Sequence, residues 1–457
     1  MNILYGLYEA DEGEVLIDGQ PAAFDGPGDA IAAGIGMVHQ HFMLVPVFTV
    51  TENVVLGVEP TDALGRIDYG EARQKVAEIS AQYGLEVDPG AIIEDLPVGL
   101  QQRVEIIKVL FREAEVIVFD EPTSVLTPQE VEDFFEIVRG LRESGKGIIF
   151  ITHKLGEMLE IADRIAVLRR GKIVGEATPG EVTPEELAEM MVGRPVELVV
   201  EKSPAEPSGP MLEVEDLVVV DHRNHRAVDG VSFQVQAGEI VGVAGVQGNG
   251  QTELVEAITG LLLPISGTIR LDGEEITHTS PRHRHRAGMA HVPEDRQRDG
   301  LVLDFDLTEN LVLDAYYDRP YSRGIVMNWV EARRHAEELV EQYDVRTPSV
   351  DVLASHLSGG NQQKLIVARE FARETKLIVA SQPTRGVDVG SIEYIHQRIV
   401  EERDQGAAVL IVSSELDEIM ALSDRILVMY RGRIVAETTP SETNHGQMGL
   451  YMAGQTA

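Results

Sequence analysis

The amino-acid sequence repeats itself, and this repeat limits the possible folds more than any other feature of the chain. Leu96–Thr127 resembles Leu357–Asp388, and Ile148–Val174 resembles Val409–Val435. In both pairs of segments, the matching residues lie 261 positions apart. A constant separation over such a length indicates a duplicated structural unit. The sequence therefore predicts two copies of one fold on a single polypeptide.

A short linker separates the two copies, which belong to the same fold class. Val200–Pro210 contains three prolines and two serines, a composition typical of a linker. In each copy, short apolar runs such as Val116–Phe119 and Leu377–Ala380 end at polar residues and alternate with amphipathic segments. This pattern is typical of buried parallel strands that alternate with helices, so the predicted class is α/β. The expected domains are residues 1–199 and 211–457, with the linker at 200–210.

The chain is strongly acidic and contains no cysteine. Its formal net charge of -37 argues against nucleic acid as a partner, because binding to phosphates requires clustered Lys and Arg. Without cysteine, disulfides, thiolate metal sites and cysteine nucleophiles are excluded. No signal peptide is recognisable, and Ile31–Val50, within the longest uncharged stretch, is too polar for a predicted membrane span. The basic run Arg282–Arg286 is interpreted as a solvent-facing surface.

A glycine-rich turn in the second copy is suited to binding phosphate. It lies within GEIVGVAGVQGNGQTELVEAITGL, between an apolar run and an amphipathic segment. Glycines at this spacing let backbone N–H groups contact phosphate at the N-terminus of a helix. Because Gln251 occupies the lysine position of G-x-x-G-x-G-K-[ST], we expect nucleotide binding through the backbone but poor stabilisation of phosphoryl transfer. The candidate nucleotide-binding residues are Gly245, Gly248, Asn249, Gly250, Gln251 and Thr252.

Two acids and a histidine in the first copy are candidate catalytic residues. Asp120 and Glu121 end the apolar run VIVFDE, and His153 ends the run GIIFITH. Asp120 is expected to hold Mg²⁺, and Glu121 to polarise the attacking water. His153 is a candidate contact for the γ-phosphate. The alternatives are surface acids in a very acidic protein and a structural histidine, but the apolar runs before these residues argue against both.

These motifs resemble those of the ABC ATPase superfamily over nearly all of two ATP-binding cassettes. The resemblance implies two tandem P-loop NTPase cassettes, each with a mostly parallel sheet core and a helical subdomain. LSGGNQQK is similar to the family signature, which closes over the nucleotide held by the opposite cassette. Gln40 resembles the Q-loop glutamine, which senses Mg²⁺ and the transporter subunit, and is therefore a candidate catalytic and metal-binding residue. The signature residues implied to bind nucleotide are Leu357, Ser358, Gly359, Gly360 and Gln362.

Three further stretches narrow the resemblance to importers. VHQHFMLVPVFTVTENVVLG, VPEDRQRDGL and QPTRGVDVG resemble the duplicated ATP-binding subunits of importers for simple sugars (ribose, galactose) and nucleosides. The resemblance implies ATP and Mg²⁺ as cofactors and transmembrane permease subunits as partners, with an extracytoplasmic solute-binding protein acting indirectly. It also implies a peripheral position at the cytoplasmic face of the cell membrane, where ATP hydrolysis drives import.

The two copies are predicted to be unequal. The residues of the second copy at the positions of Asp120, Glu121 and His153 are Ser381, Gln382 and Ser414. Neutral side chains are poor Mg²⁺ ligands and poor activators of water, so this site is expected to bind nucleotide but scarcely to hydrolyse it. The signature-like LPVGLQ of the first copy is also altered, since Pro97 and Val98 replace Ser and Gly and proline removes a backbone donor. We predict one hydrolytic site and one structural or regulatory site. Glu294 lies near the Q-loop position of the second copy.

The first copy shows no glycine-rich turn of its own. The opening NILYGLYEADEGEV resembles EAITGLLLPISGTI, so that Met1 aligns with Val255 and nothing corresponds to Met211–Leu254. We therefore expect this chain to hydrolyse ATP poorly or not at all. Two explanations for the missing segment remain: the start codon was assigned too late, or the gene is genuinely truncated. An in-frame G-x-x-G-x-G-K-[ST] in the upstream DNA would support the first, and a stop codon would exclude it.

Two other classes of function remain open. The chain could be a non-catalytic nucleotide-binding module, which ATPase assays of this chain beside an N-terminally extended form would distinguish. It could also be a soluble ABC ATPase of translation or DNA repair. Those proteins usually carry a long charged linker, a coiled coil or zinc-binding cysteines, whereas this linker is short and cysteine is absent.

Overall fold

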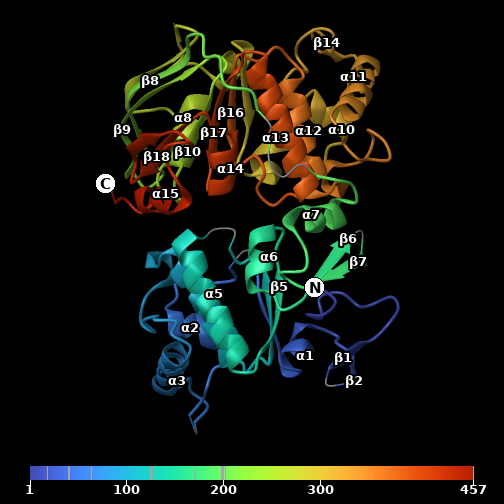
Figure 1. The fold of residues 1–457 in the computed structure, drawn as a ribbon, viewed down its shortest axis with the longest axis vertical. Coiled ribbons are helices and arrows are strands. Elements are labelled where there is room, and N and C mark those ends of the chain that lie inside the picture. The colour runs from blue at the N-terminus through green and yellow to red at the C-terminus, as the bar shows by residue number, and fades with distance from the viewer. Residues whose placement is uncertain are drawn as a thin grey trace. The chain divides into compact units, whose positions relative to one another are not determined.

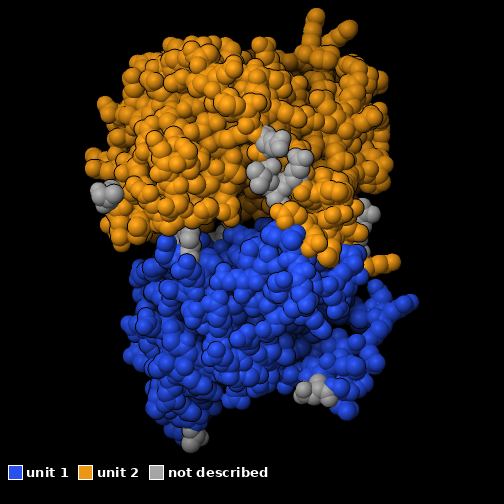
Figure 2. Space-filling view, viewed as in Figure 1, with its two compact units in different colours: residues 1–167, 173–184 blue, residues 168–172, 185–457 orange. Residues whose placement is uncertain are grey.

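The chain divides into two compact units, which Figure 2 shows in different colours. A computed structural model describes every residue except 18, 40, 41, 63, 124, 125, 127, 170, 197–199, 201, 456 and 457. The first unit comprises residues 1–167 and 173–184, and the second comprises 168–172 and 185–457. The expected boundary at 199 stays a prediction; Arg194, which precedes it, pairs with Glu393 of the second unit at 2.7 Å.

The first unit is built on a parallel sheet with the order β3-β4-β5, and Figure 1 labels its strand β5. Its strands are β3 (Ile35–Val38), β4 (Val116–Asp120) and β5 (Gly147–Ile151). Two hairpins are formed by β1 (Val15–Ile17) with β2 (Gln20–Ala22) and by β6 (Ile165–Arg169) with β7 (Lys172–Ala177), and residues 168–172 of the second hairpin are assigned to the second unit. The helices are α1 (Pro27–Ala32), α2 (Val50–Val55), α3 (Tyr69–Gln82), α4 (Val98–Phe111), α5 (Pro128–Glu143) and α6 (Leu155–Ile161), with a 3₁₀ turn at Ile93–Asp95.

An aromatic cluster forms part of the first unit's core. Phe119 of β4, Phe134 and Phe135 of α5, and Phe150 of β5 have ring centroids 5.3–6.5 Å apart. Phe119, Phe134 and Phe135 are at most 2% exposed, so α5 is packed firmly onto one face of the sheet. This packing holds the carboxyl ends of β4 and β5, where the candidate catalytic residues lie.

Strand β5 is an edge of this sheet. Within the part of the chain that the structure describes, it pairs with β4 alone. Its residues are partly exposed, whereas every residue of the equivalent strand β17 (Ala408–Ser413) is buried between β16 and β10. The two copies therefore differ in how completely their sheets are formed.

The second unit contains a six-stranded sheet with the order β13-β16-β17-β10-β18-β19 and a four-stranded antiparallel sheet with the order β12-β11-β8-β9. The six-stranded sheet is parallel except for β19. Its strands are β10 (Ile240–Ala244), β13 (Met289–Val292), β16 (Leu377–Ser381), β17, β18 (Arg425–Tyr430) and β19 (Arg433–Thr438). The antiparallel strands are β8 (Pro210–Val220), β9 (Arg226–Gln236), β11 (Ser266–Leu271) and β12 (Glu274–Glu275), and β14 (Ser322–Arg323) pairs with β15 (Val326–Met327).

Helices cover the six-stranded sheet and extend into a helical region. They are α7 (Pro184–Val192), α8 (Gln251–Thr259), α9 (Pro281–Arg286), α10 (Leu307–Leu311), α11 (Trp329–Gln342), α12 (Gly359–Phe371), α13 (Val389–Asp404), α14 (Leu416–Leu422) and α15 (His445–Met452), with short helical turns at Arg296–Gly300 and Ala354–His356. Two apolar clusters lie on opposite faces of the sheet. One joins it to α8 and the antiparallel sheet, and the other joins it to α10–α14. Strands buried on both faces explain why β10, β16 and β17 appear in the sequence as continuous apolar runs.

The interpretation of Arg282–Arg286 as a solvent-facing surface is confirmed for Arg282, His283 and Arg286, which are exposed, but is wrong for Arg284. Arg284 is fully buried, and its guanidinium donates to the carbonyl oxygens of Ala257 and Ile258, both at 2.6 Å, and of Thr277 at 2.9 Å. It thereby caps the C-terminus of α8, where unpaired carbonyls attract a cation. Burial lowers the pKa of Arg284 to about 10.

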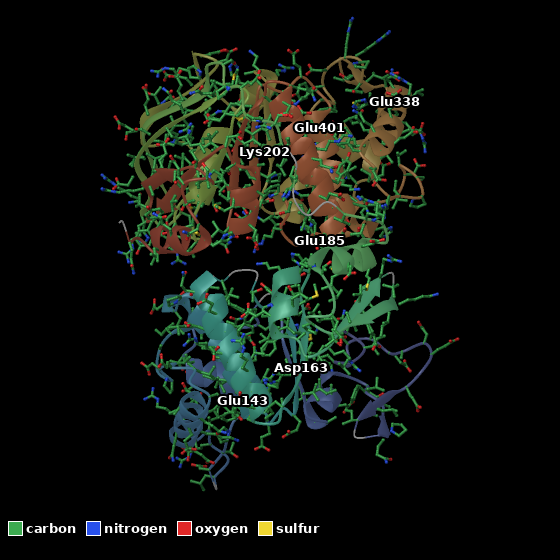
Figure 3. The ribbon with its side chains drawn as sticks, viewed as in Figure 1. Glu143, Asp163, Glu185, Lys202, Glu338 and Glu401 are labelled. Atoms are coloured by element: carbon green, nitrogen blue, oxygen red, sulfur yellow. The ribbon has the colours of Figure 1, made fainter. Side chains whose placement is uncertain are left out.

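The linker is attached to the second unit. Lys202, labelled in Figure 3, donates to the carbonyl oxygens of Leu422 and Ser423 at 2.7 and 2.6 Å and to Asp424 at 3.0 Å. The charged nitrogen therefore caps the C-terminal end of α14. Among the residues described, no helix has both the length and the apolar character needed to cross a lipid bilayer.

Candidate functional site

The predicted catalytic residues of the first unit meet at the carboxyl edge of its sheet. Asp120 is the last residue of β4, Glu121 follows it, and His153 lies two residues after β5. His153 Nδ1 lies 3.0 Å from Glu121 Oε1, and both side chains are 22% exposed. The sheet thus brings together an acid and a histidine that are far apart in the sequence, and it leaves both accessible to a ligand.

The backbone of Glu121 has an unusual conformation that directs its side chain. Its φ is +46°, in the left-handed region that non-glycine residues rarely adopt, and its N–H donates to Ile151 O at 2.9 Å. Behind it, Glu157 accepts hydrogen bonds from Thr123 at 2.5 Å and Thr152 at 2.9 Å, which tie the segments after β4 and β5 together. A strained residue held by such a network is typical of a functional site.

Asp120 is partly buried beside a second acidic group. Burial raises the pKa of the Asp120 carboxyl, and the neighbouring charge of Glu121 raises it further, while His39 opposes them. A divalent cation would stabilise the ionised form of this carboxylate. The residue therefore fits the predicted role of a Mg²⁺ ligand. Gln40, the third predicted member of this site, lies outside the described residues.

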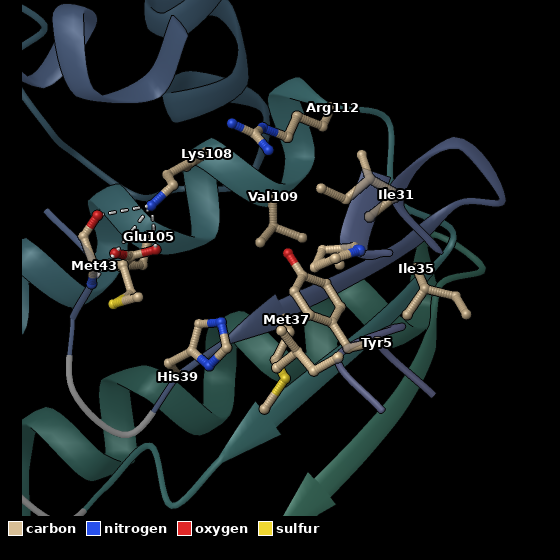
Figure 4. Close-up of a pocket in the computed structure, with 14 residues that line it drawn as sticks. Tyr5, Ile31, Ile35, Met37, His39, Met43, Glu105, Lys108, Val109 and Arg112 are labelled. Carbon is tan, nitrogen blue, oxygen red and sulfur yellow. Dashed lines mark hydrogen bonds and ion pairs between the residues drawn. The ribbon is translucent and has the colours of Figure 1, made fainter. Parts of the chain in front are cut away.

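A pocket of about 310 Å³ opens beside the end of β3 (Figure 4). Lys108 of α4 donates to Met43 O at 3.0 Å and to the buried carboxylate of Glu105 at 3.2 Å. The second unit has a pocket of about 300 Å³ at equivalent positions of the repeat. The equivalent lining residues are Pro27, Ile35, Met37, His39 and Lys108 in the first unit and Pro281, Met289, His291, Pro293 and Arg369 in the second.

The glycine-rich turn of the second unit joins β10 to α8, as predicted. Gly250 is the N-cap of α8 with a φ of +100°, and Gly248 has a φ of +88°. A Cβ at Gly250 would overlap Ala227 O, and one at Gly245 would lie 2.7 Å from Met429 O and overlap the Gln251 amide. Only glycine fits at these two positions, which gives the turn the form of a phosphate-binding cradle.

The polar side chains of this turn divide into internal and exposed groups. Gln251 is 8% exposed and folds back, with Nε2 donating to Val246 O at 3.1 Å and Oε1 accepting from Asn249 N–H at 3.1 Å. Asn249 also accepts from Arg431 N–H at 2.8 Å. Thr252 is exposed on the first turn of α8. Gln251 and Asn249 therefore shape the turn in this structure, and Thr252 is positioned to contact a ligand.

The second unit repeats the backbone conformation of the candidate catalytic residues but not their side chains. Gln382 has a φ of +49° and donates its N–H to Val412 O at 2.7 Å, as Glu121 does to Ile151. Its Oε1 accepts from Ser414 Oγ at 3.2 Å, so the pair Gln382–Ser414 occupies the place of Glu121–His153. Neither side chain is a general base, so this pair cannot take a proton from water as Glu121 could.

The predicted signature residues form the start of α12. Ser358 is the exposed N-cap, Gly359 is half-buried and Gly360 is buried. Leu357 is 9% exposed and belongs to the core. Gln362 is 2% exposed, donates to Ala354 O at 3.0 Å and accepts from Gln297 at 3.2 Å, so its amide is engaged within the protein.

The equivalent helix of the first unit, α4, begins differently. Its N-cap is Pro97, which has no N–H, and the exposed Val98 follows it. A Cβ at Gly99 would meet the Glu130 carboxylate at 2.6 Å. A carboxylate close to a helix N-terminus disfavours a second anion there.

Several polar contacts of the second site were not singled out from the sequence. Glu294 Oε1 pairs with Arg385 at 2.8 Å, and Thr252 donates to Glu294 Oε2 at 3.2 Å. Deeper in the unit, the fully buried Glu418 bonds to His396 at 2.8 Å and to Thr384 at 2.6 Å. Of these, Glu294 had a signal in the sequence, since it lies two residues after a strand equivalent to β3.

Comparison with known proteins places these features in a family. The family described as ABC transporter matches residues 1–124 and 228–385. The nucleoside import ATP-binding protein NupA of Lactococcus lactis subsp. cremoris is 51% identical over 454 residues, covering 99% of this chain and 90% of that protein. The guanosine import ATP-binding protein NupO of Bacillus subtilis is 49% identical, with coverages of 100% and 89%. The glucose import ATP-binding protein TsgD13 of Haloferax volcanii is 44% identical, with coverages of 99% and 88%.

Proposed function

This chain belongs to the ABC transporter family, and we propose that it is the ATP-binding and ATP-hydrolysing subunit of a membrane importer for nucleosides or sugars. The observation that carries this proposal is the arrangement of Asp120, Glu121 and His153 at one sheet edge, with Glu121 and His153 3.0 Å apart. An acid for Mg²⁺, an acid for water and a histidine for phosphate are the groups that hydrolysis of a nucleotide requires.

In the first cassette, each residue would have a separate role. Asp120 would hold Mg²⁺, with Gln40 as a further ligand and sensor. Glu121 would accept the proton of the attacking water, and His153, whose Nδ1 lies against the Glu121 carboxylate, would present Nε2 to the γ-phosphate. We expect the intact signature, which begins at Ser358, to contact a nucleotide bound by another cassette, as in the family.

In the second cassette, the glycine-rich turn would bind ATP without turning it over. Two observations support this role: the backbone of Gly245–Gly250 forms an intact cradle for phosphate, whereas the pair Gln382–Ser414 is neutral. Gln382 can orient water but cannot take its proton. This cassette would therefore act as a structural or regulatory site that closes on nucleotide while hydrolysis occurs in the other.

The chain would work as a peripheral subunit at the cytoplasmic face of a membrane, bound to transmembrane permease subunits. The two units have pockets lined by equivalent residues, and the pocket of the first unit lies beside the segment that contains Gln40. This supports a permease-binding surface that occurs once on each unit. A solute-binding protein would act indirectly through the permease. Nucleosides are the favoured solute class, because the relatives at 51% and 49% identity are named for nucleoside and guanosine import.

The test is ATP hydrolysis by this chain beside a form extended at its N-terminus with a G-x-x-G-x-G-K-[ST] segment. We expect low activity in the chain itself, clear activity in the extended form, and loss of that activity in Glu121→Gln. Reconstitution with the transmembrane permease subunits of a nucleoside importer should then give activity that a nucleoside stimulates. Equal, high activity in the short form would overturn the site assignment, and an inactive extended form would favour a non-catalytic nucleotide-binding module.

A further inference from the structure

A short hairpin in the helical region of the second unit carries exposed apolar side chains. β14, labelled in Figure 1, pairs with β15 so that Arg323 lies opposite Val326, and the turn between them contains Ile325. Ile325 is fully exposed, and Val330, Val326 and Trp329 are 81%, 66% and 51% exposed. These four side chains are called the apolar tip. Exposed apolar side chains that lie together mark a surface that binds another apolar phase or a partner.

The base of the hairpin is anchored in the fold. Ser322 is buried, and its N–H donates to Asp318 O at 3.0 Å. The N–H of Asn328 donates to Tyr321 O at 2.8 Å, and Ala332 on the first turns of α11 is fully buried. The apolar tip therefore lies on a fixed support, and its exposure is a property of the folded unit.

Positive charge accompanies the apolar tip in a chain that is otherwise strongly acidic. Residues 319–330 contain two arginines and no acidic residue, whereas the whole chain has a formal net charge of -37. Arg319 and Arg323 are both exposed, and no ion pair among the described residues involves either guanidinium. An arginine can lay its apolar stem along an apolar surface while its charged end stays in a polar layer. The hairpin thus combines apolar side chains with two cations that have no counter-charge.

The equivalent loop of the first unit has exposed apolar side chains without this charge. Tyr69 begins α3 as Trp329 begins α11, and Leu64 in the loop before α3 is 76% exposed. Asp62 and Asp68 lie on either side of Leu64 in the sequence. The second unit therefore differs from the first by pairing apolar exposure with positive charge.

The hairpin follows directly on residues that line the pocket of the second unit. Tyr316 and Tyr317 line this pocket, and the guanidinium of Arg282 lies over the Tyr317 ring at 4.1 Å from its centroid. Arg319 comes two residues after Tyr317. If the pocket binds a transmembrane permease subunit, the hairpin beside it lies close to the lipid around that subunit.

A lipid bilayer fits the apolar tip better than a protein does. A standard protein interface uses about 20–30 residues from each partner, whereas the tip consists of four side chains around one hairpin. Insertion into a bilayer requires no surface of complementary shape. Tryptophan is enriched at the interface between lipid and water, and arginines there are attracted to anionic headgroups.

We propose that the apolar tip inserts into the headgroup layer of an anionic lipid bilayer, where Ile325, Trp329 and Val330 contact acyl chains and Arg319 and Arg323 contact lipid phosphates. This contact is additional to attachment through permease subunits, and it rests on the proposed function for the presence of a membrane beside this surface. The acidic surface elsewhere on the chain opposes it only weakly, because charges more than about 8 Å away are largely screened at physiological ionic strength.

The experiment is flotation of the full chain, without permease subunits, with vesicles of phosphatidylcholine and phosphatidylglycerol and with vesicles of phosphatidylcholine alone. The chain should bind the anionic vesicles more tightly, and added salt should reduce this preference. Emission from Trp329, the single tryptophan, should shift to shorter wavelength on binding. Ile325→Ser and Val330→Ser should each weaken binding about tenfold. Arg323→Gln should weaken binding to the anionic vesicles alone, about fivefold.

Leu64→Ser is the matched control, because it removes an exposed aliphatic side chain from the equivalent loop of the first unit. It should leave vesicle binding unchanged. Ile325, Val330 and Leu64 are all exposed, so the three variants should unfold at the same temperature as the unmodified chain. A loss of vesicle binding at an unchanged unfolding temperature is therefore a loss of lipid contact.

The inference is wrong if the unmodified chain does not float with anionic vesicles, or if Ile325→Ser and Val330→Ser bind as tightly as Leu64→Ser. It is also wrong if Trp329 emission shifts only when permease subunits are added or the protein concentration is raised, because the tip would then contact protein. ATP hydrolysis by the N-terminally extended form, assayed without lipid, tests the proposed function separately. Hydrolysis without vesicle binding would leave that function standing and refute the lipid contact.

Discussion

Replacing Gly250 by alanine should destabilise the second unit by an amount that the structure allows us to estimate. Gly250 has a φ of +100°, which costs an L-residue about 1–2 kcal/mol. Its Cβ would overlap Ala227 O and lie 3.0 Å from Met429 Cε, and forcing a backbone shift in a packed region costs about 1–3 kcal/mol. We therefore expect a loss of about 3 kcal/mol in the free energy of unfolding. For a unit of this size, this corresponds to a fall in Tm of roughly 6–12 °C.

Gly248→Ala is the matched control. Gly248 also has a positive φ, +88°, but no atom lies within 4 Å of its Cβ position. It should lose only about 1 kcal/mol, or about 2–4 °C. Thermal unfolding of the full chain can be followed by the fluorescence of Trp329, the single tryptophan, which lies on α11 of the second unit. Equal shifts for the two variants would refute the steric reasoning, because both residues share the backbone strain and only Gly250 has the overlap.

Three other substitutions test the electrostatics. Asp120→Asn should raise the Tm of the first unit at pH 8 but not at pH 3, as measured by calorimetry. Burial and the charge of Glu121 raise the pKa of Asp120, so the stability that its protonated carboxyl contributes at low pH is lost as pH rises through this raised pKa. Glu418→Ala should cost about 3–5 kcal/mol in urea unfolding, because it leaves buried partners unpaired. Burial acts to raise the pKa of Glu418, but His396 and nearby hydroxyls lower it overall, so the stability that Glu418 contributes should be lost as pH falls through this lowered pKa. His153→Ala should reduce hydrolysis by the extended form about 100-fold while ATP binding, measured by calorimetry, persists.

The duplication and the α/β class could be predicted because they depend on periodic features of the sequence. Continuous apolar runs such as Leu377–Ala380 indicated strands buried on both faces, and β16 confirms this at Leu377–Ser381. The glycine-rich turn could be placed because its neighbours specify a strand before it and a helix after it. These predictions could be made because the secondary structure of each short segment is determined by residues close to it in the sequence.

Contacts between distant segments could not be predicted in the same way. Arg284 lies in a run of basic residues that suggests a solvated surface, yet it caps the end of α8, 26 residues earlier in the chain. The pairing of Glu294 with Arg385 joins positions 91 residues apart. Such pairings depend on which strand ends are adjacent in the sheet, and the sequence does not specify that order.

The open edge of β5 affects how the polypeptide behaves at high concentration. A β-strand without a neighbour presents unpaired N–H and C=O groups that can pair with another chain. Gly147–Ile151 is mostly apolar, and each of its residues is at least partly exposed. The first unit should therefore limit the solubility of the purified chain, and aggregates should grow by edge-to-edge addition of β5. A segment that supplied a strand beside β5 would remove this route to aggregation.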